Sequence, residues 1–167
     1  MILCKITDKK DFMNKLLGGD CFYSFLLKEA SILGLIPFEL DGRINTAFFS
    51  ADDPDADAYM AEEFIKWEDI RLTCFDLIKG KRTPTRFHFV LYLKDTALKQ
   101  ILTKEQLTKE STFIQHFVLN IRFEQGEMTL TTAVDYAAFT LDKQAEHLWD
   151  TAMMKFLSGK QIAYTLE

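Results

Sequence analysis

Cysteine is scarce in this 167-residue chain, which contains only Cys4, Cys21 and Cys74. Because three is an odd number, the cysteines cannot all pair in a disulfide framework. Their spacing contains no C-x-x-C motif, which excludes a metal or redox site of that type. Such usage is typical of a reducing compartment, where free cysteine behaves as a small buried apolar residue. We therefore expect three thiols in or near the core and a cytoplasmic location.

Long apolar runs are also absent. The longest stretch without a charged residue, 111–121, has eleven residues, whereas a membrane-spanning helix needs about 18. Lys5 and Asp8 interrupt the N-terminal segment before the apolar region of a secretory signal can form. We therefore expect no membrane partner.

Positive charge is outnumbered, since the net charge is −5 and the isoelectric point is about 5.3. This balance excludes bulk attraction to nucleic acid or anionic membranes, but it is compatible with a local basic face. The composition, with 48% apolar and 27% charged residues, is that of a globular protein. No Pro/Gly/Ser-rich linker divides the chain, so we predict a single domain over residues 1–167.

The sequence contains only partial matches to several binding and catalytic motifs. The Gly-Lys pair at 80–81 lacks the earlier glycine and the following Ser or Thr of a phosphate-binding loop. The acidic run 53–57 lacks the glycine and the glutamate that complete a calcium loop. The three histidines form no H-x-x-x-H pair, and neither a G-x-S-x-G nor a dinucleotide fingerprint occurs. We therefore predict no cofactor, no metal and no enzymatic activity, with an enzyme built from distant residues as the third alternative for function.

The order of the expected elements repeats. Hydrophobic periodicity and turn signals predict strand, helix, strand, strand and helix in each half. The expected elements are strands at 2–6, 21–33, 36–45, 86–94, 112–124 and 128–134, helices at 8–17, 60–79, 95–102 and 142–157, and a tail at 161–166 that can add an edge strand. Asp41-Gly42 predicts a turn or bulge. We therefore predict an α+β fold, with a mainly antiparallel sheet, helices on one face, and an internal duplication with pseudo-two-fold symmetry relating 1–82 to 83–167.

Three segments are distinctive: W-E-D-I-R at 67–71 with its continuation to 84, D-G-R at 41–43, and F-T-L-D-K at 139–143. Together they resemble an uncharacterised bacterial (Firmicutes-type) domain-of-unknown-function family. The resemblance spans most of the chain and implies no activity and no site residues. The element order alone is similar to three duplicated folds: the sliding-clamp domain, the TATA-binding-type saddle and the effector-binding domain of multidrug regulators. Each such fold hosts many functions.

One side of the expected sheet is polar and partly cationic. Read at period two, it carries Lys28, Arg86, His88, Tyr92, Lys94, His116, Asn120 and Arg122. The opposite side of the same strands carries mainly Phe, Leu and Ile, which the helices must cover. The leading hypothesis is a non-enzymatic binding module whose open face engages an anionic partner, such as nucleic acid, a phosphorylated ligand or an acidic protein patch. The alternative is a polar face that simply contacts water.

Glu29 is the second candidate. An undistorted strand points its carboxylate to the same side as Phe25 and Leu27, and a buried carboxylate must be paired, protonated or directed into a ligand pocket. Similarity to multidrug-sensing effector domains, in which a pocket glutamate meets cationic drugs, implies a small-molecule sensor with an inter-repeat pocket that includes Glu29. A bulge near Ala30 would instead turn Glu29 outward.

Charges are also segregated along the chain. Residues 51–70 contain eight acidic residues and one basic residue, whereas residues 71–104 contain eight basic residues and two acidic ones. Opposite blocks can drive association between copies of the chain. They can equally form two solvated surfaces, because exposed ion pairs contribute little.

Overall fold

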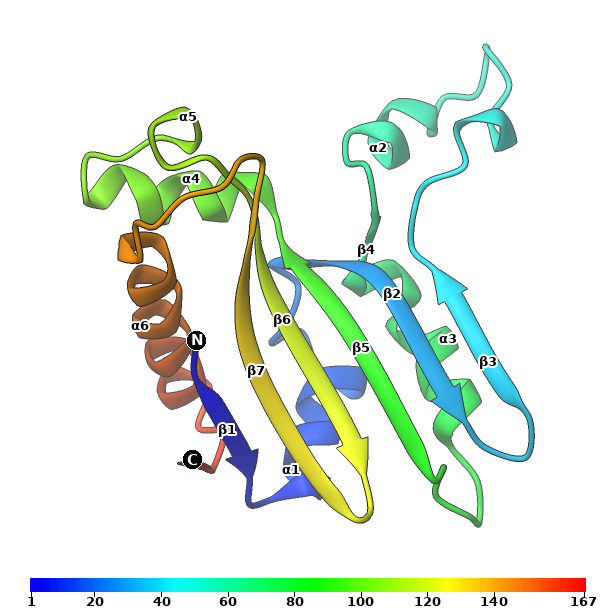
Figure 1. Ribbon diagram of the computed structural model, residues 1–167. Helices are drawn as coiled ribbons and strands as arrows, with labels where there is room; N and C mark the ends of the chain where they lie inside the picture. The colour runs from blue at the N-terminus through cyan, green and yellow to red at the C-terminus, as the bar shows by residue number, and fades with distance from the viewer.

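The computed structural model describes all residues, 1–167, and shows one eight-stranded antiparallel sheet packed against helices (Figure 1). The strands are β1 (Leu3–Ile6), β2 (Phe25–Leu33), β3 (Pro37–Asp41), β4 (Ile65–Lys66), β5 (Arg86–Leu93), β6 (Ile114–Glu124), β7 (Glu127–Tyr136) and β8 (Tyr164–Leu166). Their order is β3-β2-β5-β6-β7-β1-β8, and the short β4 pairs with β2. The predicted α+β class and the antiparallel sheet are confirmed.

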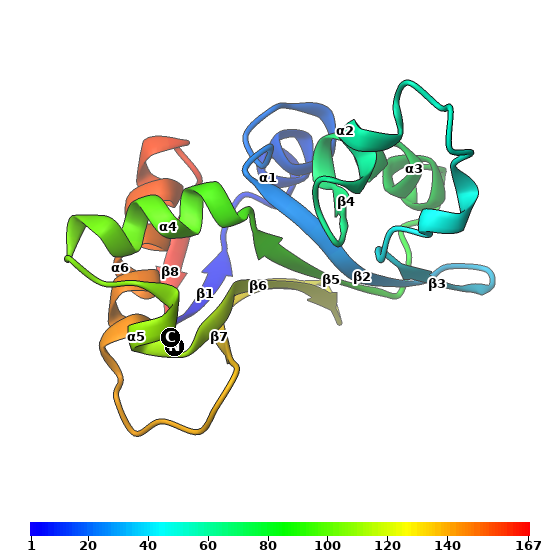
Figure 2. The same ribbon diagram turned by 90° about the horizontal axis from the view of Figure 1, so that it is seen from above.

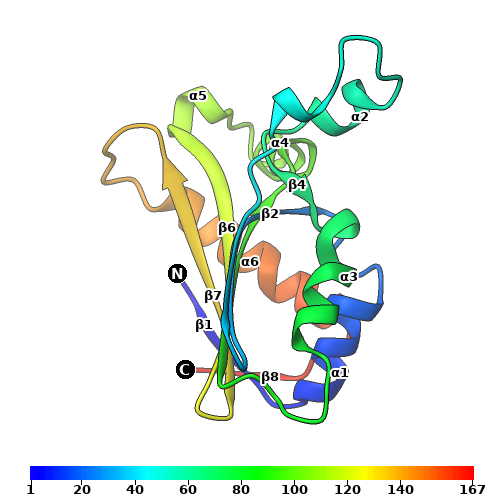
Figure 3. The same cartoon turned by 90° about the vertical axis from the view of Figure 1, so that its right-hand side faces the viewer.

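Helices α1 (Lys9–Met13), α3 (Trp67–Ile78) and α6 (Gln144–Gly159) cover one face of the sheet. The other helices are α2 (Ala56–Met60), α4 (Asp95–Lys104) and α5 (Lys109–Thr112). Figures 2 and 3 show α1, α3 and α6 on the same side of the sheet. The opposite side, which faces the viewer in Figure 1, is called the open face below. No helix is both long enough and apolar enough to traverse a bilayer.

Two tryptophans join the helices to the sheet. Trp67 of α3 contacts Phe89 of β5 edge to face, with ring centroids 5.4 Å apart, and Trp149 of α6 stacks on Phe117 of β6 at 4.9 Å. All four rings are at most 2% exposed. Each indole also donates a hydrogen bond to a backbone carbonyl, as buried indoles require. The predicted apolar strand side is therefore the core side.

Several element boundaries differ from the prediction because local contacts override the hydrophobic pattern. The strand expected over 21–33 begins only at Phe25, and the helix expected to run to 79 is preceded by α2 and β4 rather than being continuous. Residues 109–112 form α5, whose capping box uses Thr108 and Ser111. The strand expected from residue 112 therefore begins only at Ile114. The expected edge strand in the tail is β8, which pairs with β1.

The element order repeats as predicted, but the positions in the sheet do not. β5 lies between β2 and β6, whereas β1, its counterpart in the first half, lies between β7 and β8. The two halves therefore occupy non-equivalent places, and no two-fold axis exchanges them. The prediction that the three thiols lie in or near the core is confirmed, because Cys4 and Cys74 are buried and Cys21 is half-buried.

Candidate functional site

A flap, residues 43–64, projects from the sheet edge between β3 and β4 (Figure 1). It contains a short 3-10 turn, Thr46–Phe48, and helix α2. Its two ends are joined at the base, where Ile44 N–H donates to the Glu63 carbonyl at 2.9 Å and Arg43 forms an ion pair with Glu63. The flap is thus a loop closed at its neck.

Gly42 fixes the neck of the flap to β2. Its N–H donates to the Lys28 carbonyl at 2.8 Å, and its own carbonyl accepts from Ile65 N–H at 2.8 Å. A Cβ atom at this position would lie 1.8 Å from the Leu27 carbonyl oxygen, so only glycine fits. The Leu27–Glu29 stretch of β2 is bulged at this crossing.

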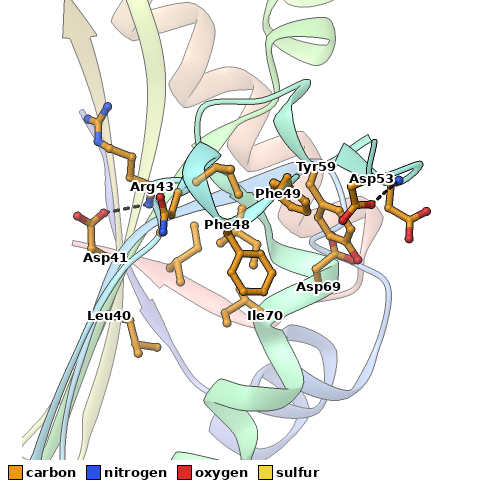
Figure 4. A pocket seen from close by; sticks show the side chains of 15 residues that line it. Leu40, Asp41, Arg43, Phe48, Phe49, Asp53, Tyr59, Asp69 and Ile70 are labelled. Atoms are coloured by element: carbon orange, nitrogen blue, oxygen red, sulfur yellow. Dashed lines mark hydrogen bonds between the residues drawn. The ribbon is translucent and has the colours of Figure 1, made fainter. Parts of the chain in front are cut away.

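A cavity of about 660 Å³ lies between the flap, the strands β2 and β3, and α3 (Figure 4). Leu27, Leu40 and Ile70 form its apolar floor. This volume is within the range of about 300–1,000 Å³ that small-molecule sites occupy. Apolar surface with a few polar groups at the mouth is the usual composition of such sites.

Aromatic rings of the flap form the outer wall of the cavity. Phe49 stacks on Tyr59 with ring centroids 5.6 Å apart and planes 19° from parallel, and Phe48 meets Phe49 edge to face at 5.5 Å. Phe48 is 81% exposed, although it is a large apolar side chain. Figure 4 shows Phe48 extending toward Ile70 across the cavity. These rings therefore present aromatic faces to an incoming ligand.

The charged groups around the cavity are mainly carboxylates: Asp41, Asp53, Asp55 and Asp69. Asp41 and Asp53 each accept a backbone N–H within the flap and its neck, at 2.9 Å. Asp69, in the first turn of α3, has neither an ion pair nor a hydrogen-bond donor, and Figure 4 shows it beside Tyr59. The single cation of the lining, Arg43, is neutralised by Glu63. The electrostatic character of the cavity is therefore negative.

The open face brings together some of the predicted partner-binding residues. Arg86 and Arg122 are exposed on the adjacent strands β5 and β6, and neither forms an ion pair. His88 lies directly opposite Arg122, and its Nε2 atom is 3.2 Å from Asn120 Oδ1. These four residues form a continuous polar patch. Glu124 lies opposite Arg86, so the patch carries charge of both signs.

The upper part of the open face is not bare, contrary to the prediction. Phe64 from the flap covers Tyr92 there, and Tyr92 is only 5% exposed. Tyr92 and His116 are stacked with ring centroids 4.0 Å apart, and Lys28 Nζ lies 5.7 Å from the centroid of the Tyr92 ring. Burial lowers the pKa of His116, an effect that nearby Asp135 partly offsets. This cluster holds the flap base rather than offering free groups.

Two further predicted positions need correction. Lys94 does not extend the polar patch, because it follows the last residue of β5 and binds Glu68 of α3 at 3.0 Å. Glu29 does not point into the core. The bulge in β2 turns it outward, as the alternative interpretation held, and it lines a cavity of about 510 Å³ on the open face with Lys28 and His88. His88 is the one residue of the second half that lines this cavity, and a sensor pocket between the halves that includes Glu29 stays a prediction.

The residues that shape the main cavity were not singled out by sequence reasoning. Phe48, Phe49 and Tyr59 lie in a segment whose acidic residues suggested only a solvated connection. The available signal was the Phe-Phe pair next to an acidic run, since exposed aromatic residues in such a loop are unusual. The acidic block of the sequence is thus the flap and the start of α3, and association between copies stays a prediction.

Among known proteins, similarity to the chain is found in one family model. No curated protein and no solved structure shows significant similarity to the chain. The duplicated folds suggested by element order therefore carry no argument about function. A family model matches residues 15–165, which is nearly the whole chain and agrees with the resemblance seen in the sequence. The chain belongs to DUF5721, a family of unknown function.

Proposed function

We propose that this protein is a cytoplasmic, non-enzymatic ligand-binding module whose flap cavity takes a small lipophilic cation. The single observation that carries the proposal is the composition of the cavity: aromatic and aliphatic walls combined with carboxylates that lack a neutralising cation. Aromatic faces attract organic cations, and removal of water strengthens this attraction. The proposal keeps the idea of a small-molecule sensor but moves its site from Glu29 to the flap.

Asp69 is the group that we expect to meet the charge of the ligand. It is exposed, has no partner in the protein and lies at the cavity beside Tyr59 (Figure 4). Asp41 and Asp53 are already engaged by backbone N–H groups. A cation between Asp69 and the aromatic wall would therefore gain a charge interaction that no protein group supplies.

Titration calorimetry with tetraphenylphosphonium tests this function. Tetraphenylborate is the matched control ligand, because it has nearly the same shape and the opposite charge. We expect the cation to bind and the anion not to bind. Asp69→Asn should weaken binding of the cation about threefold to tenfold, which corresponds to about 0.6–1.4 kcal/mol. Asp57→Asn is the matched variant, since Asp57 lies in α2 but does not line the cavity.

The aromatic wall provides a second variant that leaves the fold intact. Phe48→Ala removes a side chain that is 81% exposed, so the free energy of unfolding should change by less than about 0.5 kcal/mol. Binding of tetraphenylphosphonium should nevertheless weaken about fivefold, because a cation–π contact contributes about 1 kcal/mol. Equal binding of the two ions, or unchanged affinity in both variants, would overturn the proposed function.

Binding of an anionic partner on the open face is the second candidate. The observation in its favour is that Arg86 and Arg122 are exposed neighbours without ion pairs. Retention on a heparin column at low salt should fall when both are changed to glutamate. The matched double variant, Lys104→Glu with Lys155→Glu, changes the net charge equally at exposed helix positions without ion pairs. Equal retention of the two double variants would remove this candidate.

A further inference from the structure

A second cavity, of about 500 Å³, lies at the other end of the molecule and has the opposite electrostatic character. It is a cleft between α1 with its π-helical continuation, Asn14–Gly18, and α3. Figure 3 shows α1 and α3 next to one another on the helix-covered side of the sheet. We refer to it as the α1–α3 cleft.

The floor of the α1–α3 cleft contains no hydrogen-bonding side chain. Phe87, Phe123 and Met128 form it, where the strands β5, β6 and β7 meet, and the rings of Phe87 and Phe123 are stacked at 5.2 Å. Met13 of α1 forms part of one wall, and Phe75 of α3, which is 44% exposed, forms part of the other. Methionine adapts to ligands of irregular shape. The buried part of an occupant must therefore be apolar.

The mouth of the cleft is cationic. Lys9 and Lys10 lie on it, and no acidic side chain lines the cleft. Lys9 Nζ donates to the Gly126 carbonyl at 2.6 Å, which holds its ammonium group at the mouth. Lys10 is exposed and forms no ion pair. Glu127 interacts with the charge of Lys9, but it forms its ion pair with Lys5 and does not line the cleft. In a chain with a net charge of −5, two lysines at an apolar opening that no carboxylate lines favour an anion.

We propose that the α1–α3 cleft binds an alkyl carboxylate, with its chain between α1 and α3 and its carboxylate at Lys9 and Lys10. The chain replaces water over the apolar floor, and the head group gains charge-assisted hydrogen bonds from the ammonium groups. A cationic or uncharged amphiphile would replace water over the apolar floor, but its head group would gain no charge-assisted hydrogen bonds. This site is separate from the flap cavity and does not depend on the function proposed for it.

Calorimetric titration with octanoate, decanoate and dodecanoate, each below its micelle concentration, tests the proposal. Affinity should rise by up to about fourfold for each added methylene until the cleft is filled. Decyltrimethylammonium, with the head-group charge reversed, should bind at least about tenfold more weakly than decanoate. Affinity independent of chain length, or equal binding of the two head groups, would overturn the proposal.

Two pairs of variants locate the site. Lys10→Glu should weaken decanoate at least about threefold, whereas Lys155→Glu, the same charge change on α6, should leave it unchanged. Phe75→Glu should abolish binding, whereas Leu72→Glu should not, because Leu72 is 56% exposed on the same helix and does not line the cleft. Thermal melts of all four variants establish that they are folded. Loss of binding in the control variants as well would contradict the assignment.

A membrane surface is the competing source of an anionic amphiphile. Sedimentation with phosphatidylglycerol vesicles distinguishes it from a free carboxylate. We expect decanoate to bind without sedimentation of the protein with vesicles. Sedimentation without decanoate binding would overturn the proposal, and retention of tetraphenylphosphonium binding by Lys10→Glu would show that the two sites are independent.

Discussion

Substitution of Gly42 by alanine should both destabilise the protein and loosen the flap. The added methyl group would lie 1.8 Å from the Leu27 carbonyl oxygen and 2.7 Å from the Leu27 carbonyl carbon. Both atoms belong to the backbone of β2, which pairs with β3, β4 and β5, so no side-chain rotation relieves the clash. The neck must instead move away, and the two 2.8 Å hydrogen bonds of Gly42 are lost.

The magnitude follows from these contacts. Two backbone hydrogen bonds contribute about 1 kcal/mol each, and overpacking costs about 1–3 kcal/mol. We expect the free energy of unfolding, measured by urea denaturation, to fall by at least about 3 kcal/mol, and Tm to fall by at least about 6 °C. Gly34→Ala is the control, because its Cβ would meet no atom within 4 Å. A Gly42→Ala protein as stable as the Gly34→Ala protein would refute the proposed packing of the neck on β2.

Two further predictions concern buried contacts. Trp67→Phe should lower the free energy of unfolding by about 2–3 kcal/mol. The substitution leaves the Leu16 carbonyl without its 2.9 Å donor and opens a cavity in a fully buried site. A loss below about 1 kcal/mol in urea denaturation would contradict this prediction. Burial lowers the pKa of His116, so the unfolded chain takes up a proton first, and stability should decline as pH falls below about 6.5. The urea midpoint should decline less steeply with falling pH for His116→Phe than for the wild-type protein. Equal slopes for the two proteins would exclude His116 as a cause of the pH-dependent loss of stability.

The central strands could be predicted from the sequence because their surroundings are uniform. β5 and β6 each turn one side toward the helices and the core, so period-two alternation places Phe87 and Phe117 correctly in the core. The break expected between the strands 112–124 and 128–134 was likewise correct, and Gln125-Gly126 forms the turn there with positive φ angles at both residues. Asp41-Gly42 was expected to mark a turn or bulge, and the chain leaves β3 there.

The sheet order and the cavities could not be predicted in the same way. A strand pattern states which side is buried but not which strand is the neighbour, so the non-equivalent positions of β1 and β5 leave no trace in periodicity. The bulge in β2 reverses the direction of Glu29 through one extra residue, which no local pattern reports. The flap cavity arises where residues 43–64 meet α3, and it depends on contacts between segments that are distant in sequence.

The most direct test of the central claim is an NMR titration of the isotope-labelled protein with tetraphenylphosphonium. We predict that the largest changes in backbone amide shifts occur around the flap cavity, at Ile44, Tyr59 and Ile70, which line it. The amides of Arg86 and Arg122 on the open face should remain unchanged. Shifts concentrated on the open face, or spread evenly over the molecule, would contradict a cation site beneath the flap.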